Sequence, residues 1–231
     1  MDRDGAVAPP ALEPAYAATV VMLRDGERGV EVLLAQRPES SRSFAGAWVF
    51  PGGVVETDDL VDGASGELTA RRTAVRETRE EIGLVVDPEE LVPFSRWTPP
   101  TGSPKTLITT FFAVRVPDGD LRPEPDEVAD LAWMRPSDAL ARHARGGMTL
   151  WPPTWVTLHG LDAAVSVEAV LAAFRTGVVR AYVSRFSDDR RTVVWQEDGE
   201  YAPADAVMDA ATAARHRLVM ERLPWVYLSD F

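Results

Sequence analysis

One helical segment constrains the fold of this 231-residue chain more than any other part of it. When successive residues are placed about 100° apart around a helix axis, the apolar side chains of residues 68–82 fall into one stripe. The stripe, which we expect to be buried, contains Leu68, Val75, Thr78 and Ile82. Gly83 follows at the position where a left-handed cap would end the helix. The segment therefore predicts an amphipathic helix.

Short runs of β-branched and apolar residues on both sides of this helix predict strands. The runs before the helix are 17–23, 30–34 and 48–50, and those after it are 91–97, 107–116 and 128–134. The third run stops at Pro51-Gly52-Gly53, because proline lacks an N–H and glycine allows unusual backbone angles. A second helix is predicted at 136–145. Strands that alternate with helices predict an α/β fold.

The pattern changes after Trp151, and there we predict a C-terminal α/β extension. It would contain a helix at 166–175, a hairpin around residues 187–189 and a final helix at 204–222. No linker precedes it, so we do not expect an independent domain. The expected organisation is a flexible tail at 1–14, a main domain at 15–150 and an extension at 151–231 that packs on it.

Composition excludes several classes of protein. Hydrophobic residues make up 45% and charged residues 26%, which is ordinary for a globular protein and excludes wholesale disorder. The net charge of −12 argues against non-specific nucleic-acid binding, although divalent cations can join an acidic site to a phosphorylated substrate. No run of about 20 apolar residues is present, so we expect no membrane span. Without cysteine or a secretory start, we expect a cytoplasmic protein.

Three glutamates lie on the side of the 68–82 helix opposite the apolar stripe. Glu77, Glu80 and Glu81 are spaced i, i+3 and i+4, so their Cβ atoms lie about 5–6 Å apart. Repulsion between two such carboxylates is about 3 kcal/mol at an effective dielectric of 20 and below about 1 kcal/mol in bulk water. A solvated face needs no compensation, whereas a face that lines a cleft favours bound divalent metal.

The same helix carries a motif. Residues 76–84, R-E-T-R-E-E-I-G-L, resemble the core of the Nudix box, R-E-U-x-E-E-x-G-U, where U is a bulky aliphatic residue; only Thr78 departs. The full box begins G-x5-E-x7, and Gly53 fits its first glycine, with Asp59 in place of Glu. Sixteen residues separate Asp59 from Arg76, which indicates an insertion of about nine residues in a loop that can tolerate one.

The resemblance implies an α/β/α sandwich with a mixed β-sheet. It also implies a hydrolase that uses Mg²⁺ or Mn²⁺ to cleave a nucleoside diphosphate linked to another group. By motif position, Glu80 and Glu81 would bind metal, and Glu77 would be a ligand or the base that orients water. The Gly53 carbonyl would be the backbone ligand. Glu127, which precedes a later strand, would be a supporting carboxylate.

Residues upstream of the box resemble a second signature, L-L-…-R-x3-G-x3-F-P-G-G, which is typical of Nudix enzymes that cleave coenzyme A and its acyl derivatives. The matching residues are Leu33-Leu34, Arg42, Gly46 and Phe50-Pro51-Gly52-Gly53. Arg42 is either a solvated charge or a clamp on a substrate phosphate. The alternatives are ADP-ribose, NADH or nucleoside triphosphate substrates, or a nucleotide-sensing module without catalysis.

Other residues could contact the substrate. Arg76 flanks the acidic face, where it could orient the carboxylates or bind substrate. Trp97 and Trp151-Pro152-Pro153 could line a pocket and stack on adenine, whereas Trp48 and Trp133 are expected in the core. We expect a small nucleotide-type substrate as the partner, with no nucleic acid and no membrane; a homodimer is a further option.

Overall fold

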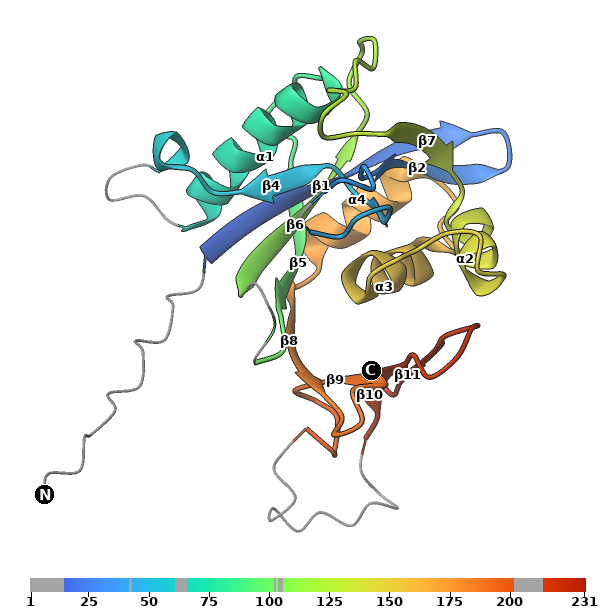
Figure 1. Cartoon of the computed structure of the whole chain (residues 1–231). Helices are drawn as coiled ribbons and strands as arrows, with labels where there is room; N and C mark the ends of the chain where they lie inside the picture. Colours follow the sequence, from blue (N-terminus) through green and yellow to red (C-terminus); the bar gives the residue numbers. More distant parts are fainter. Residues whose placement is uncertain (1–14, 42, 61–65, 102, 104–105, 202–213) are drawn as a thin grey trace, which may run out of the picture.

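The structure is a computed structural model that describes residues 15–41, 43–60, 66–101, 103, 106–201 and 214–231 (Figure 1). The strands of the first part are β1 (Ala15–Gly26), β2 (Gly29–Gln36), β3 (Trp48–Val49), β4 (Gly52–Val54), β5 (Val92–Thr98), β6 (Leu107–Arg115) and β7 (Asp130–Met134). Those of the C-terminal part are β8 (Arg180–Phe186), β9 (Thr192–Trp195), β10 (His216–Val219) and β11 (Val226–Ser229). The helices are the 3₁₀ turn η1 (Thr57–Asp59), α1 (Gly66–Ile82), α2 (Pro136–Ala144), α3 (Pro152–Leu161) and α4 (Val167–Thr176).

The described strands form one mixed sheet of eleven strands. Its main path runs β11-β10-β9-β8-β5-β6-β1-β2-β3, while β4 pairs with β1 and β7 with β2. The β1–β6 and β5–β8 pairs are parallel, and the other described pairs are antiparallel. The short β4 strand, which sequence reasoning treated as a turn after Pro51, places Gly53 opposite Ala18.

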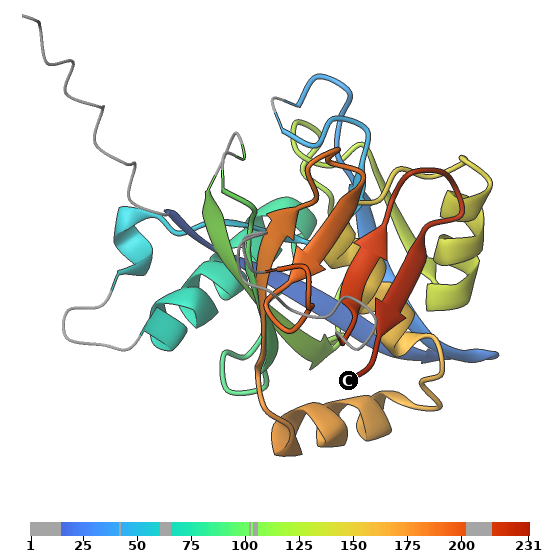
Figure 2. The ribbon, with the colours of Figure 1, turned by 90° about the horizontal axis from the view of Figure 1, so that it is seen from below.

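Helices cover both faces of the central strands, because side chains alternate along a strand and both sides of β1 are apolar. Val20 and Met22 of β1 face α1 and belong to one buried cluster with Ala74. Val21 and Leu23 face the other way and join the larger cluster, which includes residues of α3 and α4. Figures 1 and 2 show α1 and α4 on opposite sides of β1 and β6. The predicted α/β/α sandwich is confirmed.

The apolar stripe of α1 is buried in part as predicted, with Val75 only partly buried against the core cluster. Thr78 and Ile82 are buried as predicted, but Leu68 is 42% exposed because it lies in the first turn of the helix, beyond the sheet-packed part. The Thr78 hydroxyl is buried without a hydrogen-bond partner among the described residues. Trp48 is buried in the core as predicted, and Trp133 is partly buried against the cluster on the α1 side.

The C-terminal extension lengthens the same sheet. Its β8 strand lies parallel to β5, and the predicted hairpin around residues 187–189 joins β8 to β9. The predicted final helix is wrong where the structure describes it: residues 216–219 form β10, which pairs with both β9 and β11. His216 and Leu218 alternate inward there, a period of two that a helix would not give. Residues 1–14 and 204–213 lie outside the described residues.

None of the helices among the described residues combines the length and apolar character needed to span a bilayer.

Candidate metal centre and active site

Three carboxylates converge beside the C-terminal half of α1. One oxygen from each of Glu77, Glu81 and Glu127 lies within 4.8 Å of the others. The first two are one helical turn apart on α1, and the third comes from the connection that leads to β7. Glu81 is buried, Glu77 is partly buried and Glu127 is exposed, so the cluster is only partly open to solvent, and its geometry favours the metal-binding alternative.

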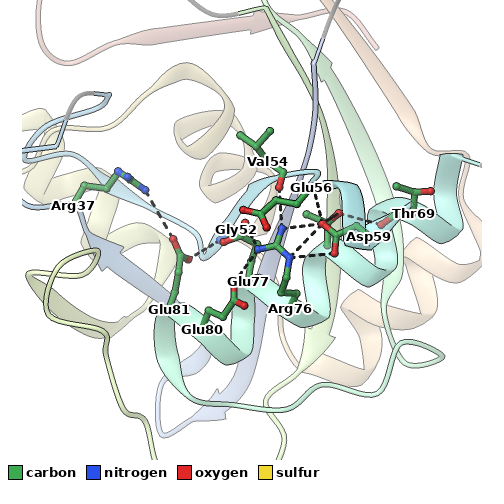
Figure 3. Close-up of polar contacts among 11 residues, drawn as sticks. Arg37, Gly52, Val54, Glu56, Asp59, Thr69, Arg76, Glu77, Glu80 and Glu81 are labelled. Atoms are coloured by element: carbon green, nitrogen blue, oxygen red, sulfur yellow. Dashed lines mark hydrogen bonds and ion pairs between the residues drawn. The ribbon is translucent and has the colours of Figure 1, made fainter. Parts of the chain in front are cut away.

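Glu81 is the most buried member of the cluster, at 4% exposure. Its Oε2 accepts a hydrogen bond of 2.8 Å from the backbone N–H of Gly52, and its Oε1 lies 3.9 Å from Nη1 of Arg37 (Figure 3). Burial is the main reason that the pKa of Glu81 rises to about 8, and the neighbouring Glu77 and Glu127 add to that rise. The site therefore holds carboxylate charge that the protein alone does not fully compensate.

Glu77 lies directly against the β4 turn. A Cβ atom on Gly53 would overlap its carboxylate, so a larger residue there would push the Glu77 carboxylate out of its position. Gly52 is constrained as well: its φ of +151° is unfavourable for other residues, and a Cβ would meet the carbonyl of Ala18. Burial raises the pKa of Glu77, although Arg76 opposes that shift.

Arg76 holds several of these acids in place. Its guanidinium donates to Asp59, to the Val54 carbonyl, and to Glu77 and Glu80, with N–O distances of 2.8–3.3 Å (Figure 3). The hydrogen bond to Asp59 is the main reason that the pKa of Arg76 is raised. Its predicted role in orienting carboxylates fits these contacts, and its fork is already occupied by protein groups.

Asp59 anchors that arginine. Burial alone would raise its pKa, but hydrogen bonds from Arg76, from the Glu56 backbone N–H and from the Thr73 hydroxyl outweigh burial and lower it. Asp59 and Arg76 thus form this contact although sixteen residues separate them in the sequence. Residues 61–65 of that segment lie outside the described residues.

Glu80 is separate from the cluster. Its side chain is 47% exposed and its carboxylate pairs with Arg76 at 2.9 Å. Of the predicted trio, the structure thus brings Glu77 and Glu81 together with Glu127 and leaves Glu80 at the solvent side.

The position of Glu127 depends on the end of α1. The last carbonyls of a helix lack partners within the helix. Here the backbone N–H groups of Arg122 and Glu124 donate to the carbonyls of Ile82 and Glu81. A turn follows, in which the Glu127 N–H donates to the Glu124 carbonyl. The segment that caps α1 therefore also delivers the third carboxylate.

The predicted substrate-binding residues have different outcomes. Arg42 lies outside the described residues. Trp97 is 4% exposed and stacks on Tyr182 with ring centroids 3.8 Å apart, so its indole face is not available to a base. The prediction for Trp97 does not fit this packing, because the C-terminal extension covers the face on which it lies.

Sequence reasoning missed Arg37. It directly follows β2, and its buried Nε has no hydrogen-bond partner among the described residues. Its position at the end of a buried strand, where a side chain emerges at the sheet edge, was the available signal. Its Nη1 lies 3.9 Å from Oε1 of Glu81, a distance beyond a hydrogen bond.

These residues fit a hard divalent cation. Three convergent carboxylates supply oxygen ligands of the type that Mg²⁺ and Mn²⁺ prefer. Two of them have raised pKa values because they are buried together, and a bound cation would relieve that repulsion.

Comparison with known proteins identifies the family. The NUDIX domain matches residues 13–151, which is more than half of the chain. The chain belongs to the NUDIX family. Its residues 66–82 are the Nudix helix, and two of the three clustered carboxylates, Glu77 and Glu81, lie on that helix.

Two relatives and one solved structure show the range of this Nudix protein's neighbours. CTP pyrophosphohydrolase of Escherichia coli is 36% identical over 114 residues, 49% of this chain and 73% of that protein. NAD-capped RNA hydrolase NudC of Pseudomonas aeruginosa is 32% identical over 124 residues, 54% of this chain but 36% of that protein. A crystal structure of a NUDIX hydrolase from Alicyclobacillus acidocaldarius has a TM-score of 0.62 at 24% identity, over 73% of this chain and all of that one. The structural likeness supports the fold, and the family indicates a hydrolase of phosphorus-containing acid anhydrides.

Proposed function

We propose that this Nudix protein is a divalent-metal-dependent hydrolase that cleaves the diphosphate linkage of a nucleoside diphosphate joined to a second group. The observation that carries the proposal is the convergence of Glu77, Glu81 and Glu127 within 4.8 Å. A buried carboxylate such as Glu81 is unfavourable beside two other carboxylates, and it becomes favourable when the group binds a cation that a diphosphate substrate also needs.

The ion would be Mg²⁺ or Mn²⁺, and when bound it would activate water and neutralise charge on the phosphate. The three clustered carboxylates would hold it, with Glu81 fixed by the Gly52 N–H. The Gly53 carbonyl remains our proposed backbone ligand, because its residue lies against Glu77. Glu80 reaches solvent while Arg76 steadies it, which suits a carboxylate that orients the attacking water.

Arg37 would bind a substrate phosphate. Its guanidinium has a buried N–H without a partner among the described residues, and it lies at the edge of the acidic cluster. Once a cation neutralises Glu81, the fork of Arg37 can donate to phosphate oxygens, for which its geometry is suited. Arg42 remains a second proposed phosphate contact.

Three classes of substrate, which differ in the group joined to the nucleoside diphosphate, have support. The upstream signature favours coenzyme A or acyl-CoA, the similarity to CTP pyrophosphohydrolase favours a nucleoside triphosphate, and ADP-ribose or NADH is the third class. The enzyme is proposed to act in the cytoplasm, because the chain has no cysteine. A homodimer and the absence of a nucleic-acid partner stay predictions.

A substrate panel tests the proposal. Purified protein is incubated with acetyl-CoA, ADP-ribose, NADH and CTP, each with Mg²⁺, with Mn²⁺ and with EDTA, and the products are separated by chromatography. We expect metal-dependent release of a nucleoside monophosphate or its phosphorylated derivative from at least one class. Tight binding of these nucleotides by calorimetry without any turnover would contradict the proposal and favour a nucleotide-sensing module.

A further inference from the structure

Two large aromatic side chains lie in contact on the surface, and both remain partly exposed. Phe44 is 40% exposed and Trp151 is 45% exposed. Their ring centroids are 4.7 Å apart, and the planes meet at 77°, an edge-to-face pair. Most other tryptophans of the chain pack into hydrophobic clusters. A half-exposed indole next to a half-exposed phenyl ring is therefore a candidate ligand-binding surface.

The backbone has a distinctive local conformation at each ring. Trp151 is the residue that caps the N-terminus of α3, and Pro152 and Pro153 follow it. Proline at the start of a helix fixes the backbone of the first turn, which also limits the positions of the preceding residue. Phe44 has a φ of +58°, a left-handed conformation that is uncommon for an aromatic residue. The platform is therefore preorganised for binding.

The pair is joined by backbone contacts to the residue that faces the acidic cluster. Phe44 and Arg37 lie in the same β2–β3 connection, where Ala47 donates to the Phe44 carbonyl and its own carbonyl accepts from the Arg37 N–H. The segment that ends at Trp151 runs alongside, since the Trp48 N–H donates to the Thr149 carbonyl. Figure 2 shows this connection at the top of the view, beside the segment that leads into α3. One compact loop thus links Arg37, next to Glu81, with an exposed aromatic platform.

We propose that Phe44 and Trp151 form the site for the nucleobase of the substrate, with Arg37 on the phosphates between the base and the carboxylate cluster. The proposal rests on the proposed function and specifies which residues recognise the nucleoside part. A planar heterocycle can stack on an aromatic side chain, and such stacking tolerates different bases because every base has a π-face. It also assigns a role to the Trp-Pro-Pro sequence, which the metal centre does not explain.

The test separates base binding from phosphate binding. The affinities of ADP and of inorganic pyrophosphate, both with Mg²⁺, are measured by calorimetry on the full chain and on Trp151→Leu, which keeps an apolar side chain but has no ring. We expect wild type to bind ADP more tightly than pyrophosphate. We expect Trp151→Leu to weaken ADP binding about tenfold, because it removes the ring on which the base would stack, and to leave pyrophosphate binding unchanged.

Matched variants and a spectroscopic measurement complete the design. Trp151→Phe should restore part of the ADP affinity, and Phe231→Leu, which removes an exposed ring at the C-terminal end, should change neither ligand. In NMR spectra the adenine protons of bound ADP should shift upfield with wild type and much less with Trp151→Leu, a ring-current effect that a purely structural role would not produce.

Three results would overturn the proposal. An equal loss of ADP and pyrophosphate affinity in Trp151→Leu would show that the residue supports the fold or the phosphate site. Unchanged ADP affinity in that variant would place the base elsewhere. If wild type binds neither ligand, the proposed function fails and the base site fails with it; if wild type shows base-dependent binding without hydrolysing any nucleotide, only the proposed function fails.

Discussion

Two carboxylates of this molecule are equally buried, but their pKa values are shifted in opposite directions. Glu81 on α1 and Asp198 after β9 are each 4% exposed. Asp198 accepts two short hydrogen bonds from the Arg217 guanidinium and two more from the backbone N–H groups of Glu200 and His216. Burial alone would raise the pKa of Asp198, but these donors outweigh it and lower the pKa, whereas the pKa of Glu81 rises to about 8.

The difference lies in the partners. Asp198 faces a bidentate arginine, while Glu81 has one backbone donor, an arginine at 3.9 Å and two further carboxylates nearby. A buried acid with a full set of donors joins two strands and stabilises them. A buried acid among other acids destabilises the metal-free fold and gains a favourable partner only when a cation binds. We therefore assign a structural role to the C-terminal network and a functional role to the cluster on α1.

The largest effect expected from this contrast is on turnover. Replacing a metal ligand should abolish activity, so Glu81→Gln should lower kcat/KM by about 10³-fold, or roughly 4 kcal/mol of transition-state stabilisation. Steady-state rates on the best substrate of the panel give the comparison. Asp198→Asn is the matched control: its folded fraction should keep turnover within a few-fold of wild type, and full activity in Glu81→Gln would refute the assignment.

The next largest effect is on the free energy of unfolding, and we expect it when Asp198 is replaced. Asp198→Asn removes the buried carboxylate that pairs with the Arg217 guanidinium and leaves it, among the described residues, only the exposed Glu200 carboxylate, at 2.9 Å. The free energy of unfolding should therefore fall by about 3–4 kcal/mol. Urea unfolding followed by circular dichroism measures it. A loss below about 1 kcal/mol would mean that Asp198 is no more structural than a surface ion pair.

Glu81→Gln should have the opposite effect on stability when metal is absent. The ordinary pKa of this carboxyl is 4.5 and the folded value is about 8, so the native state holds a proton that the unfolded state releases. Stability of metal-free wild type should therefore decrease as pH rises from 4.5 to 8. At pH 7, Glu81→Gln should be more stable than wild type by about 2–3 kcal/mol in EDTA. Urea midpoints at several pH values test this, and parallel pH profiles would contradict it.

Sequence patterns predicted the local elements well and the long-range placements poorly. The acidic helix and the flanking strands follow from periodicities of 3.6 and 2 within short windows, and those survive folding. Glu77 and Glu81 share a helix, so their proximity is also a local property. Glu127 is predictable as a ligand only by analogy, because its placement depends on how a distant turn caps α1.

The errors have a common physical origin. Trp97 could not be assigned correctly because its burial depends on Tyr182, which lies far along the chain and packs on it through the β5–β8 pair. Residues 216–219 form a strand because β9 and β11 pair with them on both sides, and pairing of that kind overrides local helical preference. Arg37 was missed because its importance comes from Glu81, a residue on another element.

The smallest predicted effect concerns a histidine in the C-terminal network. Burial lowers the pKa of His216, whose ring nitrogens contact Glu197 at 2.7 Å and the Tyr227 hydroxyl at 3.0 Å. The unfolded state therefore binds a proton more readily, and stability should be lost as pH falls below 6.5. His216→Gln should show a flatter stability profile between pH 7 and pH 5. Equal slopes of stability against pH in wild type and His216→Gln would contradict a contribution of His216 to the pH dependence. That result would also weaken the assignment of a structural role to the C-terminal network.

The most direct test of the contrast is where a metal ion binds. Crystals of the full chain soaked in Mn²⁺ and measured near the manganese absorption edge reveal each ion by its anomalous scattering. We predict a strong peak coordinated by Glu77, Glu81 and Glu127, and no peak at Asp198. A well-diffracting, manganese-soaked crystal without a peak between those three glutamates would contradict the central claim.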